Sequence, residues 1–214
     1  MNMKILKFKP ALLLLIGVAL FMYACTQVED NSRSGSLLSI DSIDGQPGAP
    51  GIQAGTPLLS DTCDQTVAEL PPPQDPDLCS VTNDNAAIHF TNDFLQIGPG
   101  SGVGDPSFIN DIIVNRYRVD YFRSNNRNTP GVDVPFGIDG TMNIRVPVDG
   151  AAVASIIVVR HQAKREPPLA ELDSEQTEGV ITANAQIKTF GADISGHTVD
   201  ATGFLEIHFA NFAN

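Results

Sequence analysis

Positive charge is scarce in this chain of 214 residues, which holds 13 lysines and arginines against 25 aspartates and glutamates. The formal net charge is −12 at pH 7. A surface this negative repels the phosphate backbones of nucleic acids and the headgroups of anionic lipids. The imbalance therefore argues against nucleic acid as a partner and predicts a soluble domain.

The common catalytic and ligand-binding motifs are also missing. The four histidines are dispersed without an HExxH pair, there is no G-x-S-x-G elbow, and the glycine-rich residues 98–104 fit neither a P-loop nor a dinucleotide-binding turn. We therefore expect no cofactor. Asp133, Asp139 and Asp149 are weak calcium candidates near strand ends, because they lack the order of a known calcium loop and turn formation accounts for them equally well.

The sequence has one long apolar run, over residues 11–24, and three lysines lie within the first nine residues before it. Fourteen residues would span about 21 Å as a helix, which is short of the roughly 30 Å hydrocarbon core of a bilayer. A basic start followed by a short apolar run is typical of an export signal. We predict a signal peptide over residues 1–24, whose removal would leave a mature chain of net charge −15.

The run ends in Met22-Tyr23-Ala24-Cys25, which resembles the lipobox of bacterial lipoproteins. Ala24 and Cys25 match that motif, whereas Met22 and Tyr23 replace its usual leucine and small residue. The resemblance implies that Cys25 becomes the acylated, palmitate-bearing N-terminus of the mature chain. Several acyl chains would anchor it permanently to the cell envelope, facing away from the cytoplasm, in the outer membrane if the bacterium is Gram-negative. An ordinary secretory signal cleaved nearby is the alternative.

Two cysteines remain once Cys25 is assigned to lipid. Cys63 and Cys79 form an even pair in an oxidising compartment, so we predict a disulfide between them, with two free thiols as the alternative. A loop of this size gains about 3 kcal/mol in the chain-entropy model. Residues 62–80 include four prolines, so the cross-link rather than a core would hold this segment.

The stretch over residues 25–61 is rich in serine, glycine, proline and aspartate, with scattered apolar side chains. Residues 45–53 read as three collagen-like triplets, which are too few for a triple helix. We therefore predict a flexible acidic tether here, between the lipid and a folded domain over residues 81–214.

Short runs of period two follow from residue 81, separated by glycine, asparagine, aspartate and proline, as is typical of strands with one wet face. Residues 86–95 predict the first strand, with Ile88 and Phe90 inward. Residues 153–159 are almost wholly apolar, which predicts a strand covered on both faces or lying centrally in a sandwich. Asp139-Gly140 and Asp149-Gly150 predict hairpin turns. In the other strands the expected inward residues are Ile113, Tyr117, Val119, Tyr121, Met142, Ile144, Val146, Val148, Ile181, Ala183, Ala185, Ile187, Val199, Ala201, Leu205, Ile207 and Phe209.

Six or seven strands joined by short turns predict an all-β fold, an antiparallel β-sandwich of immunoglobulin-like type, with a barrel as the next choice. Helix is nearly absent, apart from one turn expected over residues 169–175. Tryptophan is absent and both remaining cysteines precede the domain, so the immunoglobulin hallmarks are missing.

Residues 115–119, 128–135, 159–164 and 209–212 are similar to segments of a group of exported bacterial lipoproteins. The resemblance covers residues 80–214 and implies export and a β-rich domain. The group is uncharacterised, so the resemblance lends no activity and no site.

Arg116, Arg118, Arg123 and Arg127 gather four of the ten basic residues that follow the signal. Arginine forks bind carboxylates, and long loops on rigid sheets often carry recognition. We therefore predict a binding surface for an envelope protein or glycan around residues 123–140. The alternative is that these arginines neutralise nearby acids such as Asp120 and Asp133.

Two function classes follow. The first, which the missing motifs favour, is a membrane-anchored lipoprotein with a non-catalytic binding or envelope-structural domain. The second is an envelope hydrolase with dispersed catalytic carboxylates. A pocket holding two carboxylates, or a nucleophile beside a histidine, would favour the enzyme, whereas exposed aromatic side chains would favour binding.

Overall fold

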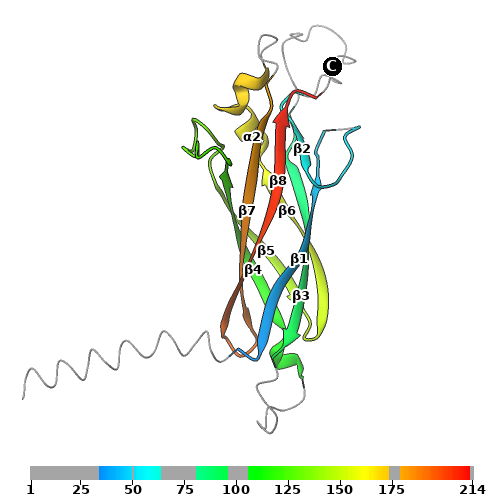
Figure 1. Cartoon of the computed structure of the whole chain (residues 1–214). Helices are drawn as coiled ribbons and strands as arrows, with labels where there is room; N and C mark the ends of the chain where they lie inside the picture. Colours follow the sequence, from blue (N-terminus) through cyan, green and yellow to red (C-terminus); the bar gives the residue numbers. More distant parts are fainter. Residues whose placement is uncertain (1–33, 50, 64–80, 96–105, 174–178, 213–214) are drawn as a thin grey trace, which may run out of the picture.

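The computed structural model describes residues 34–49, 51–63, 81–95, 106–173 and 179–212, and two β-sheets pack together within them (Figure 1). The smaller sheet has the strand order β1-β3-β6 and the larger one has the order β2-β8-β7-β4-β5. The predicted all-β sandwich is confirmed. No helix in these ranges is long and apolar enough to cross a bilayer.

The described strands are β1 (Ser36–Gln46), β2 (Leu58–Asp61), β3 (Asp84–Phe94), β4 (Ile112–Phe122), β5 (Ile138–Val146), β6 (Gly150–Val159), β7 (Ile181–Asp193) and β8 (Thr198–Ala210). The helical segments are η2 (Phe108–Asn110), α2 (His161–Lys164) and η3 (Leu169–Asp173). Their strand pairs are antiparallel except that β2 runs parallel to β8, so the larger sheet is mixed rather than purely antiparallel as predicted.

The hydrophobic core lies between the two sheets, because each strand turns alternate side chains inward. Ile88 and Phe90 of β3 are fully buried, as predicted. The inward residues expected in β5, β7 and β8 are buried or partly buried, which confirms their alternation. Tyr121 of β4 and Phe209 of β8 meet edge to face with ring centroids 6.4 Å apart.

One expected inward residue lies out of phase. The register of β4 shifts between Val114 and Arg116, so the strand buries Ile112 and Val114 before this irregularity and Tyr117 after it. Ile113 is only partly buried. A bulge adds one residue and reverses the phase of the alternation, and a strict period of two cannot reveal it.

The prediction of a flexible tether is wrong for much of residues 25–61. β1 pairs with β3 along its whole length, and Leu38 and Ile43 are buried. The register of β1 shifts between Ile40 and Ser42, which breaks the apolar alternation in the sequence. The tether prediction missed this strand for that reason, and only ten residues separate Cys25 from its start at Ser36.

The collagen-like stretch is also part of the folded domain. Gly48 donates its backbone N–H to the buried Asp84 carboxylate at 2.8 Å. A Cβ on Gly48 would lie 2.1 Å from the Asn83 carbonyl oxygen, so the glycine permits a close backbone approach. Ala49 is buried, and Leu58 of β2 is fully enclosed. Residues 45–49 therefore pack on the sandwich instead of forming a spacer.

Two further expectations need correction. β6 is an edge strand of the smaller sheet, and Val153 is 52% exposed, so the strand is not covered on both faces. Gly140 lies inside β5 rather than in a turn, and a glycine fits there because the ring of Tyr117 occupies the space that a Cβ would need. Asp149 does form a turn, with φ of 51°, but this turn connects the two sheets instead of closing a hairpin.

The two ends of the sandwich differ. At the end that we call the β1 pole, β1 begins, and Ser36 donates to the Asn110 carbonyl of η2 at 2.7 Å. At the opposite end, the α2 pole, β6 leads into α2 beside residues 123–137, which join β4 to β5. Figure 1 shows β1 starting far from α2, with the strands running between the two poles.

Candidate functional site

The short helix α2 is held across the α2 pole by Asn83, which directly precedes β3, and by Asp84, the first residue of β3. Asn83 accepts a hydrogen bond from the His161 amide at 2.7 Å and lies 3.1 Å from Nδ1 of the same histidine. Three residues further on, Lys164 turns into the sandwich, where its side chain is fully buried. α2 therefore has an inner face tied to β3 and an outer face at the surface of the pole.

A buried polar cluster lies beneath α2. Lys164 Nζ is 2.9 Å from Asp84 Oδ2, and both side chains are 0% exposed. The Ser60 hydroxyl donates to the same Oδ2 at 2.6 Å, while Gly48 N–H binds Oδ1 at 2.8 Å. Removing two charges from water is costly unless each finds close partners, and the Asp84 carboxylate has three.

Tyr121 closes the inner side of this pole. Its hydroxyl donates to the Val158 carbonyl of β6. Burial is the main reason why the pKa of Tyr121 lies above its ordinary value, so the hydroxyl stays protonated. It therefore acts as a fixed hydrogen-bond donor between the two sheets.

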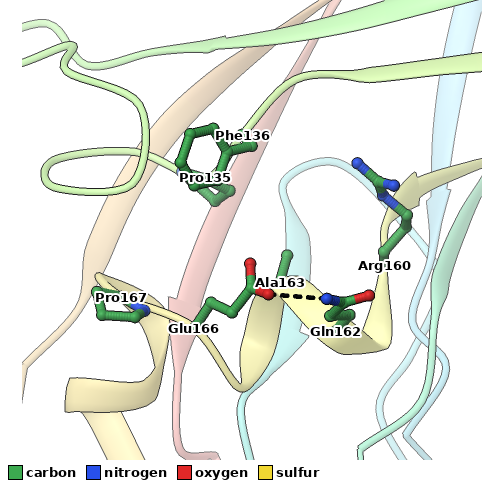
Figure 2. A pocket seen from close by; sticks show the side chains of 7 residues that line it. All are labelled: Pro135, Phe136, Arg160, Gln162, Ala163, Glu166 and Pro167. Atoms are coloured by element: carbon green, nitrogen blue, oxygen red, sulfur yellow. Dashed lines mark hydrogen bonds between the residues drawn. The ribbon is translucent and has the colours of Figure 1, made fainter.

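The outer side of the pole carries a small hollow of about 180 Å³. Figure 2 shows Pro135 and Phe136 facing Gln162 and Glu166, with Arg160 at the side. Gln162 donates to Glu166 at 2.8 Å, so the carboxylate in the hollow already has an amide partner. The remaining lining residues are Ala163 and Pro167.

An exposed aromatic side chain and a cation line this hollow. Phe136 is 55% exposed, and Val132, four residues earlier on the same loop, is 63% exposed. Arg160 donates to the Gly137 carbonyl at 3.3 Å and has no carboxylate partner among the described residues. The surface around Val132, Phe136 and Arg160, which we call the pole surface, therefore combines apolar area with a cation that can still pair.

The four arginines predicted to bind a partner are largely occupied within the chain. Arg118 binds both oxygens of Asp120, at 2.7 and 2.9 Å, and also Asp139 at 2.8 Å. Arg116 stacks over the Phe190 ring at 4.3 Å. These contacts support the alternative in which the arginines of β4 pair locally.

The two arginines that follow β4 have partners as well. Arg127 pairs with Asp133 at 2.8 Å, and Arg123 donates to the Asp133 carbonyl at 3.4 Å. Desolvation alone would raise the pKa of Asp133, but hydrogen bonds from Thr129 and Arg127 outweigh it and hold that pKa below its ordinary value. The contacts give residues 123–133 an internal polar framework.

The three weak calcium candidates are not brought together. Asp133 binds Arg127, Asp139 binds Arg118, and Asp149 accepts the Phe94 amide at 3.0 Å. Within the described ranges, no three or more histidines, cysteines, aspartates or glutamates lie close enough to hold a metal ion.

The residues of the lipid and disulfide predictions lie mainly outside the described part. Cys25 and Cys79 are not described, whereas Cys63 follows β2 and is 1% exposed. Both the acylation of Cys25 and the Cys63–Cys79 bond therefore remain predictions.

The sequence interpretation missed the residues that build the α2 pole. Lys164 and Asp84 lie 80 positions apart in the sequence. Lysine and aspartate side chains are usually exposed, so these residue types did not suggest a buried pair. One signal was available, because Lys164 is one of only two lysines after the predicted signal peptide. The small number of lysines did not indicate that the Lys164 side chain points into the sandwich.

No protein-family model matches the chain, and neither a curated protein nor a solved structure shows significant similarity to it. The similarity to exported lipoproteins and the immunoglobulin-like type of the sandwich therefore stay predictions.

Proposed function

We propose that this chain is an exported bacterial lipoprotein whose sandwich binds a protein partner through the pole surface, without catalysis. The observation that carries the binding role is the pole surface itself. It places the exposed Phe136 beside Arg160 in the lining of one hollow, with the exposed Val132 four residues before Phe136 on the same loop. Arg160 is a cation without a carboxylate partner among the described residues. Apolar side chains beside an arginine are typical of the centre of protein interfaces.

The position of the pole surface supports this proposal. Ten residues separate an anchor at Cys25 from the start of β1, and β1 begins at the opposite pole. A strand of 11 residues covers about 35 Å, so β1 carries the chain about that far from the residue where it enters the sandwich toward the pole surface. A partner in the periplasm or outside the cell would meet this end of the domain first.

The size of the hollow favours a side chain of a macromolecule over a free small ligand. Its volume of about 180 Å³ is below the roughly 300–1,000 Å³ of small-molecule sites. Arg160 favours a carboxylate, because a guanidinium fork binds both oxygens of one. We therefore propose that an acidic side chain of a protein partner docks beside Phe136.

The hydrolase alternative has weaker support. The hollow contains one carboxylate, Glu166, and this group is bonded to Gln162. None of the four histidines lines it. A pair of carboxylates or an activated nucleophile is what a hydrolase would need at this position.

We predict that Phe136→Ala and Arg160→Ala each weaken partner binding by about 2 kcal/mol, roughly thirtyfold, as at interface hot spots. The full-length protein and each variant would be immobilised, and recovery of envelope proteins would be measured by quantitative mass spectrometry. The affinity of the recovered partner would then be measured directly.

Phe204→Ala and Arg118→Ala are the matched controls. Phe204 is 64% exposed on β8, and Arg118 is exposed but paired with Asp120 and Asp139. Both controls should keep the parent affinity. Equal binding by the parent and the two pole variants, or recovery of glycan in place of protein, would contradict the proposal.

We also propose the disulfide between Cys63 and Cys79. The burial of Cys63 at the end of β2 and the export signal support it. Alkylation of the unfolded, unreduced protein is expected to label neither cysteine, whereas alkylation after reduction labels both. Quantitative labelling of both without reduction would rule the bond out.

A further inference from the structure

The buried Lys164 and Asp84 side chains are in close contact, but the amine is not oriented as in a hydrogen-bonded ion pair. Nζ lies 2.9 Å from Oδ2, yet the amine makes no contact with the direction of a hydrogen bond. The carboxylate, by contrast, is held at both oxygens, by Ser60 and by Gly48. An amine therefore lies against a fixed carboxyl group in a site closed to solvent.

We propose that Lys164 and Asp84 condense to form an intramolecular isopeptide bond. This modification is independent of the proposed binding function. Contact in a folded protein replaces an encounter in solution and supplies a high effective concentration. Burial also favours the product, because condensation removes two charges that the interior solvates poorly.

The bonds and protons balance without any co-reactant. The Lys164 ammonium transfers one proton to Oδ2 of Asp84, which gives a neutral amine beside a carboxylic acid. The amine nitrogen then attacks Cγ, and a second proton passes from nitrogen to Oδ2. Cγ–Oδ2 breaks, one water molecule leaves, and an amide joins Nζ to Cγ.

Each oxygen of the Asp84 carboxylate has a different hydrogen-bond donor, and the two donors would assist different steps of the condensation. Gly48 N–H contacts Oδ1, the oxygen that would carry negative charge after the attack and remain as the amide carbonyl. The Ser60 hydroxyl donates to Oδ2, the oxygen that would leave as water. A backbone N–H therefore stabilises the intermediate while a hydroxyl assists the leaving group.

The product would join α2 covalently to the start of β3. α2 is a helix of four residues, and it supplies Gln162 and Ala163 to the hollow at the pole. Such a helix has little stability of its own. The cross-link would fix it in place under the pole surface.

Peptide mapping of the purified full-length protein tests the proposal. After reduction, alkylation and digestion, we expect a branched peptide that joins the Asp84 segment to the Lys164 segment and is lighter than their sum by one water molecule. Amine labelling in denaturant should then miss Lys164. Full recovery of Lys164 with a free amine from folded protein would overturn the proposal.

Lys188 is the matched control within the same molecule. It lies 3.0 Å from Asp200, but these side chains are 45% and 50% exposed, so this pair should stay unlinked and its amine should be labelled. Lys164→Arg keeps the cation and should give no branched peptide. Protein kept unfolded from synthesis onward should also give none, and a branched peptide in that sample would contradict a reaction that depends on the folded site.

Discussion

Lys164→Met is expected to destabilise the sandwich by about 3–5 kcal/mol, the range for removing one partner of a buried ion pair. Asp84 would keep Gly48 and Ser60 as hydrogen-bond donors but would lose the positive charge that lies 2.9 Å away. If the isopeptide bond has formed, Lys164→Met instead removes the cross-link and leaves Asp84 as a buried carboxylate without a cation, so a loss of at least this size is expected. Urea unfolding followed by circular dichroism measures the change.

The surface pair gives the matched control for this prediction. Lys188→Met removes a lysine from a half-exposed pair and should cost less than about 1 kcal/mol. Adding Asp84→Leu to Lys164→Met should restore part of the stability, because it removes the stranded charge. A Lys164→Met variant as stable as Lys188→Met would show that the buried pair has no special role.

Gly48→Ala is expected to destabilise the domain by about 3 kcal/mol or more, at the upper end of overpacking effects. The added methyl would lie 2.1 Å from the Asn83 carbonyl oxygen and 2.5 Å from the Thr82 hydroxyl. To relieve the clash, Gly48 must move away from Asp84, which weakens a hydrogen bond to a buried carboxylate. Thermal and urea unfolding would both report the loss.

Gly55→Ala is the control in the same stretch of sequence. Nothing lies within 4 Å of a Cβ at Gly55, and its φ is not positive. This variant should change the stability by less than about 0.5 kcal/mol. If Gly48→Ala also leaves the stability unchanged, residues 45–49 are not packed as described, and this result would favour the flexible tether predicted from the sequence.

The sequence predicted the later strands well because their alternation is regular. Residues 181–187 alternate without interruption and residues 199–209 do so except at Gly203 and Phe204, and the structure buries or partly buries the predicted members. β1 was missed because its register shift places Leu38 and Ile43 an odd number of positions apart, although both are buried. Composition then favoured a tether, since serine, glycine and aspartate dominate this stretch.

The candidate site was harder to predict than the fold. The cluster of arginines in residues 116–127 and the nearby Asp120 and Asp133 were visible in the sequence, but the pairing of Arg118 with Asp139 depends on the register of β4 and β5. Arg160 lies outside that cluster and joins the loop through Gly137 after the chain has folded. The buried pair of Lys164 and Asp84 depends on α2 crossing the pole, and no local pattern in residues 159–168 indicates that crossing.

Acylation of Cys25 is the central claim, because the proposed orientation of the pole surface depends on it. The measurement is mass spectrometry of the full-length chain expressed in bacteria and extracted from membranes with detergent. The account predicts a mature N-terminus at Cys25 that carries added acyl mass, and release of the domain from the membrane in Cys25→Ser. A mature chain that starts at another residue, or that starts at Cys25 without acyl mass, would contradict it.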